Sequence, residues 1–109
     1  MDINLIIDAI ESKRVLITSH AKTEAEEDGL EFEVIYYSVF GGEIIKDYPQ
    51  DRPCPSCLVL GMTPSNEPVH SVWAYDQRRQ IAILITVYRP DPSLWIDWRI
   101  RRNINGTSS

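Results

Sequence analysis

The sequence lacks the features that mark several classes of protein. No run of apolar residues approaches the roughly 18 that a membrane-spanning helix needs. The N-terminal stretch has acidic residues among its apolar positions, and it lacks the basic start and small-residue cleavage site of a signal peptide. A Gly-rich phosphate loop, a Ser-His-Asp signature and an HExxH motif are also missing. We therefore expect a cytoplasmic protein that does not contact membranes.

Cysteine is scarce, and the two that occur form a Cys-Pro-Ser-Cys motif at Cys54 and Cys57. Such a pair can be half of a zinc site or a redox pair. Zinc would need two more ligands, and the only histidines are His20 and His70. A redox pair favours a helix start, whereas this pair runs into an apolar, strand-like segment. We expect two reduced thiols, no bound metal and no cofactor, with a zinc or redox role as the weakest alternative.

The net charge of −5 is unevenly distributed along the chain. Residues 1–51 hold twelve of the sixteen acidic side chains, whereas residues 78–102 hold six of the eleven basic ones, all of them Arg. An acidic total argues against nonspecific coating of nucleic acid. The acidic net charge does not exclude one local phosphate site, because Arg can bind phosphate through two parallel hydrogen bonds. Alternatively, these arginines are solvated on a C-terminal helix and a hairpin turn.

The hydrophobic pattern predicts one α+β domain over residues 1–102, followed by a disordered tail over residues 103–109. N-terminal helices should be followed by a small antiparallel sheet, with the apolar run at residues 15–18 as a strand or an extended link. The expected helices are residues 3–12, a segment that begins near Thr18 and stops near Gly29, and a third that ends at Gly41-Gly42. The expected strands are Glu43–Tyr48, Cys57–Thr63, Pro68–Tyr75 and Gln80–Arg89.

The C-terminal part predicts a central strand and then a helix. Gln80–Arg89 is the most apolar and β-branched run, which favours a central position in the sheet. Asp91 followed by Pro92 is typical of a helix start. Trp95 and Trp98 would dock this last helix on the body of the domain.

A few polar residues in the apolar strands are candidates for chemistry. RNA can be cleaved without a metal when its 2′-hydroxyl attacks the adjacent phosphate, which requires a base, an acid and a cation. His70 and Tyr88 can transfer protons, and Arg89 can supply the charge. Tyr88 and Arg89 point to opposite faces of a strand unless it ends or bulges there, which Pro90 permits. The alternative is that His70 is a hydrogen-bonded structural residue.

Further candidates lie in the helices and turns. His20 begins an acidic helix, where it is either a site residue or part of the N-terminal cap. We also expect Arg52, Arg78 and Arg79 to contact the substrate, because an Arg side chain can bind a phosphate through two hydrogen bonds. The carboxylates that follow His20 are expected on a solvated helix face.

Four segments within residues 16–98 form a recognisable set: ITSHAKTEAEEDGLEFEVIYYSVFGGEIIKDYP, CLVLGM, PVHSVWAYD and ITVYRP. Together they resemble a small bacterial domain of unknown function. Genes for such domains often lie beside one for a YgiT-type zinc-finger protein, in an arrangement similar to the MqsR–MqsA toxin–antitoxin pair. The resemblance extends to the RelE and BrnT toxins that cleave messenger RNA, which implies a small antiparallel sheet packed by helices.

This resemblance implies a type II toxin, a metal-independent ribonuclease that a zinc-finger antitoxin of the YgiT/MqsA kind neutralises. His70 falls where such toxins carry a proton-transfer candidate, and Arg89 falls near a basic residue that acts on the phosphate. His20 matches a histidine of the domain family. The family often has Arg in that helix, where this chain has Glu24 and Asp28. The alternative is a non-catalytic protein-binding module of the same fold.

Overall fold

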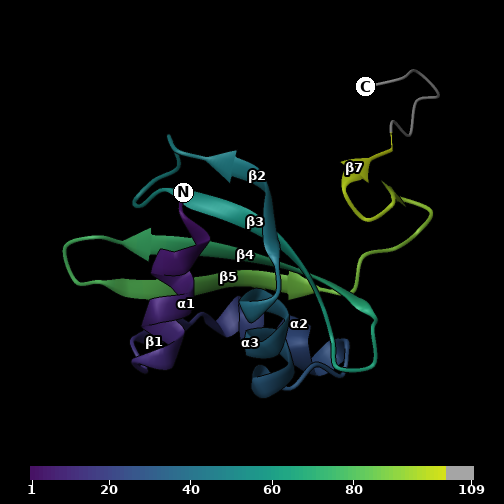
Figure 1. Cartoon of the computed structure of the whole chain (residues 1–109), viewed down its shortest axis with the longest axis horizontal. Coiled ribbons are helices and arrows are strands. Elements are labelled where there is room, and N and C mark those ends of the chain that lie inside the picture. Colours follow the sequence, from purple (N-terminus) through teal and green to yellow (C-terminus); the bar gives the residue numbers. More distant parts are fainter. Residues whose placement is uncertain (103–109) are drawn as a thin grey trace.

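The computed structural model describes residues 1–102, which form a five-stranded sheet, three helices and a small C-terminal hairpin (Figure 1). The predicted α+β class is confirmed. The predicted tail at residues 103–109 lies outside the described residues. Within residues 1–102, every helix is too short or too polar to cross a membrane.

Local capping signals set where the first two helices begin. The Asp2 carboxylate accepts a hydrogen bond from the Asn4 amide, and the Thr18 hydroxyl accepts one from the Ala21 amide. The third helix follows Glu31, whose side chain makes no capping bond. All three helices agree with the predicted segments to within two residues. They are α1 (Ile3–Glu11), α2 (Ser19–Glu27) and α3 (Phe32–Phe40).

The strands confirm the predicted segments, but the sheet is mixed rather than purely antiparallel. The strands are β1 (Val15–Ile17), β2 (Glu43–Tyr48), β3 (Ser56–Met62), β4 (Pro68–Asp76) and β5 (Ile81–Tyr88). Their order is β1-β5-β4-β3-β2, and β1 runs parallel to β5. A parallel pair needs a long crossover, which α2, α3 and the three intervening strands supply. The predicted central strand, β5, is internal, while β4 occupies the centre.

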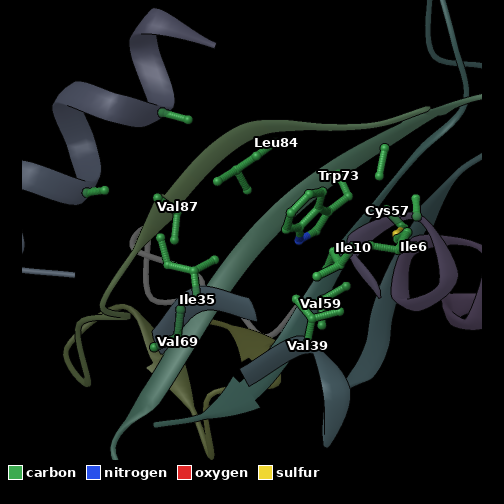
Figure 2. Packing of buried hydrophobic residues seen from close by; sticks show 14 of the residues in the cluster. Ile6, Ile10, Ile35, Val39, Cys57, Val59, Val69, Trp73, Leu84 and Val87 are labelled. Carbon is green, nitrogen blue, oxygen red and sulfur yellow. The ribbon is translucent and has the colours of Figure 1, made fainter. Parts of the chain in front are cut away.

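One face of the sheet packs against all three helices and forms the core (Figure 2). Trp73 of β4 is fully buried at its middle, and its indole N–H donates to the Ser71 hydroxyl over 2.9 Å. Gly61 of β3 lies directly against α3, since a Cβ there would be 1.8 Å from the Ser38 carbonyl oxygen. The backbone of β3 at Gly61 therefore contacts the backbone of α3 at Ser38 directly.

A β-bulge in β5 decides which side chains face the helices. The pairing with β4 shifts at Ile85, which has no partner. Leu84 before the bulge and Val87 after it both join the core, although they are three residues apart. Tyr88 is consequently on the opposite face, directly across from His70.

The predicted C-terminal helix is wrong, because this segment forms a hairpin. The Asp91 carboxylate accepts the Ser93 amide over 2.8 Å and starts one turn, as the sequence signal predicts. Asp97 and Trp98 then have positive φ angles of 50° and 63°, which reverse the chain. The hairpin lies beyond the end of β5 (yellow in Figure 1). Its strands are β6 (Trp95–Ile96) and β7 (Ile100–Arg101).

Candidate functional site

His70 is fully buried between β5 and the C-terminal hairpin, and both of its ring nitrogens are hydrogen-bonded. Nε2 lies 2.6 Å from the carbonyl oxygen of Trp98, and Nδ1 lies 3.1 Å from the hydroxyl of Tyr88. The ring also meets Trp95 edge to face, with 4.4 Å between ring centres. Because a carbonyl can only accept, Nε2 carries the proton and Nδ1 accepts the Tyr88 O–H.

The same environment keeps His70 neutral. Burial lowers its pKa from the usual value of 6.5, because a charged imidazolium is poorly solvated there. The hydrogen bond to the Trp98 carbonyl acts in the opposite direction but is the smaller effect. His70 is therefore a neutral base whose acceptor nitrogen points at a phenol.

Tyr88 is half-buried and remains a neutral donor. Burial raises its pKa, and the neighbouring Tyr48 and Glu24 add to that rise. The positive charge of Arg101 has the opposite effect on the pKa of Tyr88, so this arginine lies within electrostatic reach of the hydroxyl. The guanidinium carbon of Arg101 is 5.9 Å from the ring centre of Trp95. We refer to His70 and Tyr88 together as the dyad.

Arg89 is bonded to Asp28 and Glu67 rather than to the dyad. Its Nε donates to the Asp28 carbonyl over 2.9 Å, and its amide donates to the Asp28 carboxylate over 2.8 Å. Its Nη1 lies 3.5 Å from the carboxylate of Glu67. Arg89 therefore ties the end of β5 to the end of α2. Its predicted role at a phosphate stays a prediction.

His20 lies at the second position of α2, and its side chain is 70% exposed. Its Nε2 is 3.2 Å from the Glu24 carboxylate. That carboxylate also accepts the Val87 amide over 3.2 Å and the Thr86 hydroxyl. His20 is thus connected to β5 through Glu24 and not to the dyad directly.

The three arginines predicted to bind substrate lie at the other end of the sheet. Arg78 and Arg79 are in the turn between β4 and β5, six residues along β4 from the dyad, a span of about 20 Å. Arg79 is 3.8 Å from the Asp76 carboxylate, and Arg52 is exposed in the loop between β2 and β3. Arg78 also lines a cavity of about 400 Å³ with Cys54 and its neighbours. The predicted site residues therefore fall into separate groups.

The two cysteines are free thiols in different surroundings. Cys57 is fully buried in the core, whereas Cys54 is half-buried in the loop before β3. Burial raises the pKa of the Cys57 thiol to about 12. In residues 1–102 there is no group of three or more His, Cys, Asp or Glu side chains arranged to hold a metal ion.

Sequence reasoning missed the contribution of the C-terminal hairpin to the site. Trp95 packs on His70, the Trp98 carbonyl fixes its tautomer, and Arg101 provides a charge. The available signal is the density of Trp and Arg after Pro92, a segment for which the Asp91-Pro92 pattern predicts a helix instead.

The site and fold define a class of protein: a small α+β domain with helices on one face of a mixed sheet and, on the other face, a buried His hydrogen-bonded to a half-buried Tyr. The chain belongs to the family described as Domain of unknown function (DUF4258), whose match covers residues 17–89. This confirms the predicted resemblance to a domain of unknown function. The match contains both residues of the dyad and ends before the hairpin that covers it. No curated protein and no solved structure matches the chain.

Proposed function

We propose that this domain is a metal-independent ribonuclease that cleaves messenger RNA in the cytoplasm, with the dyad as its proton-transfer machinery. The observation that supports this function is the hydrogen bond from the Tyr88 hydroxyl to the acceptor nitrogen of a neutral, buried His70. A neutral imidazole next to a phenol can accept the phenol's proton at the moment when the phenol oxygen takes a proton from the substrate. Tyr88 is only half-buried, so the residue is not sealed off from solvent.

The reaction uses the 2′-hydroxyl of the RNA as its nucleophile. The 2′-hydroxyl proton passes to the Tyr88 oxygen while the Tyr88 proton moves to Nδ1 of His70. The 2′ oxygen forms a bond to phosphorus, and the bond from phosphorus to the 5′ oxygen breaks, which leaves a 2′,3′-cyclic phosphate. The departing 5′ oxygen takes a proton from a water molecule, and the hydroxide left behind takes the proton that His70 returns through Tyr88. The Trp98 carbonyl stabilises the imidazolium by accepting its Nε2–H.

A cation must stabilise the charge on the phosphate oxygens in the transition state. Arg101 is our first candidate, because its charge already acts on Tyr88. Arg89 is the candidate predicted from sequence, and it would first have to leave Asp28 and Glu67. We assign no step to His20, because it contacts the Glu24 carboxylate and not the dyad. Arg52, Arg78 and Arg79 are proposed to contact more distant phosphates.

The proposed partner is a zinc-finger antitoxin that neutralises the enzyme. This proposal is supported by the resemblance to toxin–antitoxin pairs. A protein bound over the hairpin and Tyr88 would block substrate without touching the core.

A second candidate is a non-catalytic protein-binding module. The complete burial of His70 and the occupation of both ring nitrogens favour it. In that case the dyad only anchors the hairpin to the sheet.

Cleavage of end-labelled single-stranded RNA in the presence of a chelator distinguishes the two candidates. We expect products with 2′,3′-cyclic phosphate ends, and a rate loss of about a hundredfold or more in Tyr88→Phe. Tyr37→Phe is the matched control, since Tyr37 is exposed on α3. Arg101→Ala and Arg89→Ala identify the cation, because only the one at the phosphate should lower the rate by a similar factor. A wild-type protein without cleavage supports the binding module, whereas cleavage that Tyr88→Phe leaves unimpaired would exclude the dyad as the proton-transfer machinery.

A further inference from the structure

A groove of about 440 Å³ lies where α2 turns into α3, on the side of the sheet that the helices cover. This volume is within the range that accommodates side chains or small ligands. The groove combines an apolar floor with a rim that is mainly acidic. Its lining consists of Lys22, Ala25, Glu26, Gly29, Leu30, Glu31, Phe32 and Glu33.

The floor is built by the turn between the two helices. Ala25 and Leu30 are almost completely buried, and Phe32 is half-buried. Gly29 has a φ of 64°, the left-handed conformation that ends α2 and brings Leu30 back under it. Phe32 therefore supplies most of the apolar surface on which a partner's side chain can pack, over a base formed by Ala25 and Leu30.

The rim carries three exposed carboxylates, on Glu26, Glu31 and Glu33, against one cation, Lys22. In the part of the chain that the structure describes, none of these three carboxylates forms an ion pair. The rim therefore presents negative charge that the domain itself does not neutralise.

One of these glutamates stands where the helix dipole disfavours it. Glu26 is in the last turn of α2, where the dipole favours cations, and a bound cation would relieve this placement. Glu31 occupies the N-cap of α3, where the dipole favours a carboxylate. Its side chain makes no capping hydrogen bond, so the helix itself does not engage it.

We propose that this groove, over residues 22–33, binds a basic segment of a partner protein. An apolar side chain of that segment would pack on Ala25, Leu30 and Phe32, with Lys or Arg beside the glutamates. RNA is the wrong occupant, because its phosphates carry the same charge as the rim. The proposal does not depend on ribonuclease activity, since the groove and the dyad lie on opposite faces of the sheet.

Selection of displayed peptides, about twelve residues long, on the full-length protein tests this proposal. We expect enriched peptides to carry Lys or Arg around a Leu or an aromatic residue. One such peptide should shift the amide resonances of residues 22–33. Its affinity should fall about tenfold or more in Glu26→Lys/Glu31→Lys, because two attractive charge pairs become repulsive.

Glu11→Lys/Glu27→Lys is the matched control. Both residues are exposed acids in the last turn of a helix, and neither lines the groove. The control has the same net charge and should retain the wild-type affinity within about twofold. The proposal is overturned by an absence of enriched basic peptides, by an equal loss of affinity in the control, or by resonance shifts outside residues 22–33. Single-stranded RNA that shifts the same amides would also overturn it.

Discussion

The Tyr88 hydroxyl lies 3.1 Å from Nδ1 of His70, and the bulge at Ile85 makes this contact possible. Without the extra residue, strict alternation from Leu84 would turn Tyr88 toward the helices. With it, Tyr88 faces the C-terminal hairpin, where Trp98 bonds the other nitrogen of His70. Two distant segments thus meet on one imidazole ring.

The burial of His70 predicts a pH-dependent stability. Its folded pKa is lowered from 6.5, so below that pH the unfolded chain binds a proton that the folded chain does not. The free energy of unfolding should be constant above about pH 7 and should fall as the pH decreases below 6.5. Urea denaturation at several pH values measures this slope.

Two variants assign the slope to His70. His70→Gln should be less stable than the wild type but should lose the slope between about pH 5 and 7. His20→Gln changes an exposed histidine and should retain it. A flat wild-type profile, or a slope that disappears in His20→Gln, would contradict the assignment.

Gly61 allows α3 to lie directly on β3, so adding a methyl group should be costly. A Cβ at this position would be 1.8 Å from the Ser38 carbonyl oxygen, and this contact is with backbone that cannot rotate away. We expect Gly61→Ala to lower the free energy of unfolding by about 3 kcal/mol. Gly41→Ala is the control, because no atom lies within 4 Å of its Cβ and its φ is −101°. Similar urea midpoints for the two variants would show that α3 does not pack as described.

Most of the helices and strands could be predicted because their signals are local. The Thr18 cap, the left-handed Gly29 and the Pro-rich turn after Tyr48 each act within a few residues. The bulge at Ile85 has no such signature, since Ile83 and Thr86 would suit either register. Which residues share a face with His70 therefore could not be read from alternation alone.

The C-terminal hairpin shows a local signal overruled by tertiary contacts. Asp91 starts a helical turn, with its carbonyl accepting the Leu94 and Trp95 amides. The turn does not continue, because Trp98 adopts a positive φ and places its carbonyl on His70, 28 residues earlier. Sequence patterns over ten residues do not contain that partner, so the hairpin and the contribution of Arg101 were not predictable.

Trp95 and Trp98 should contribute very unequally to stability. Trp95 is 8% exposed and packs edge to face on His70, so Trp95→Ala should cost about 3–5 kcal/mol. Trp98 is half-buried and holds His70 through its backbone carbonyl, which Trp98→Ala retains. We expect Trp98→Ala to lower the free energy of unfolding by less than half as much as Trp95→Ala does. Thermal or urea denaturation measures both values. Equal losses would mean that the indole of Trp98, and not its carbonyl, anchors the hairpin.

The two cysteines should differ in reactivity and in their importance for folding. Cys57 is fully buried with a pKa of about 12, so its thiolate is almost absent near neutral pH. A thiol reagent such as Ellman's reagent, applied at about pH 8, should modify Cys54 in the folded protein and Cys57 only after unfolding. Cys57→Ser places a hydroxyl in the core and should cost about 1–3 kcal/mol, whereas Cys54→Ser should change stability by less than about 0.5 kcal/mol. Rapid modification of both thiols in the native protein, or a fully stable Cys57→Ser, would show that β3 is more open than its packing against α1 and Trp73 implies.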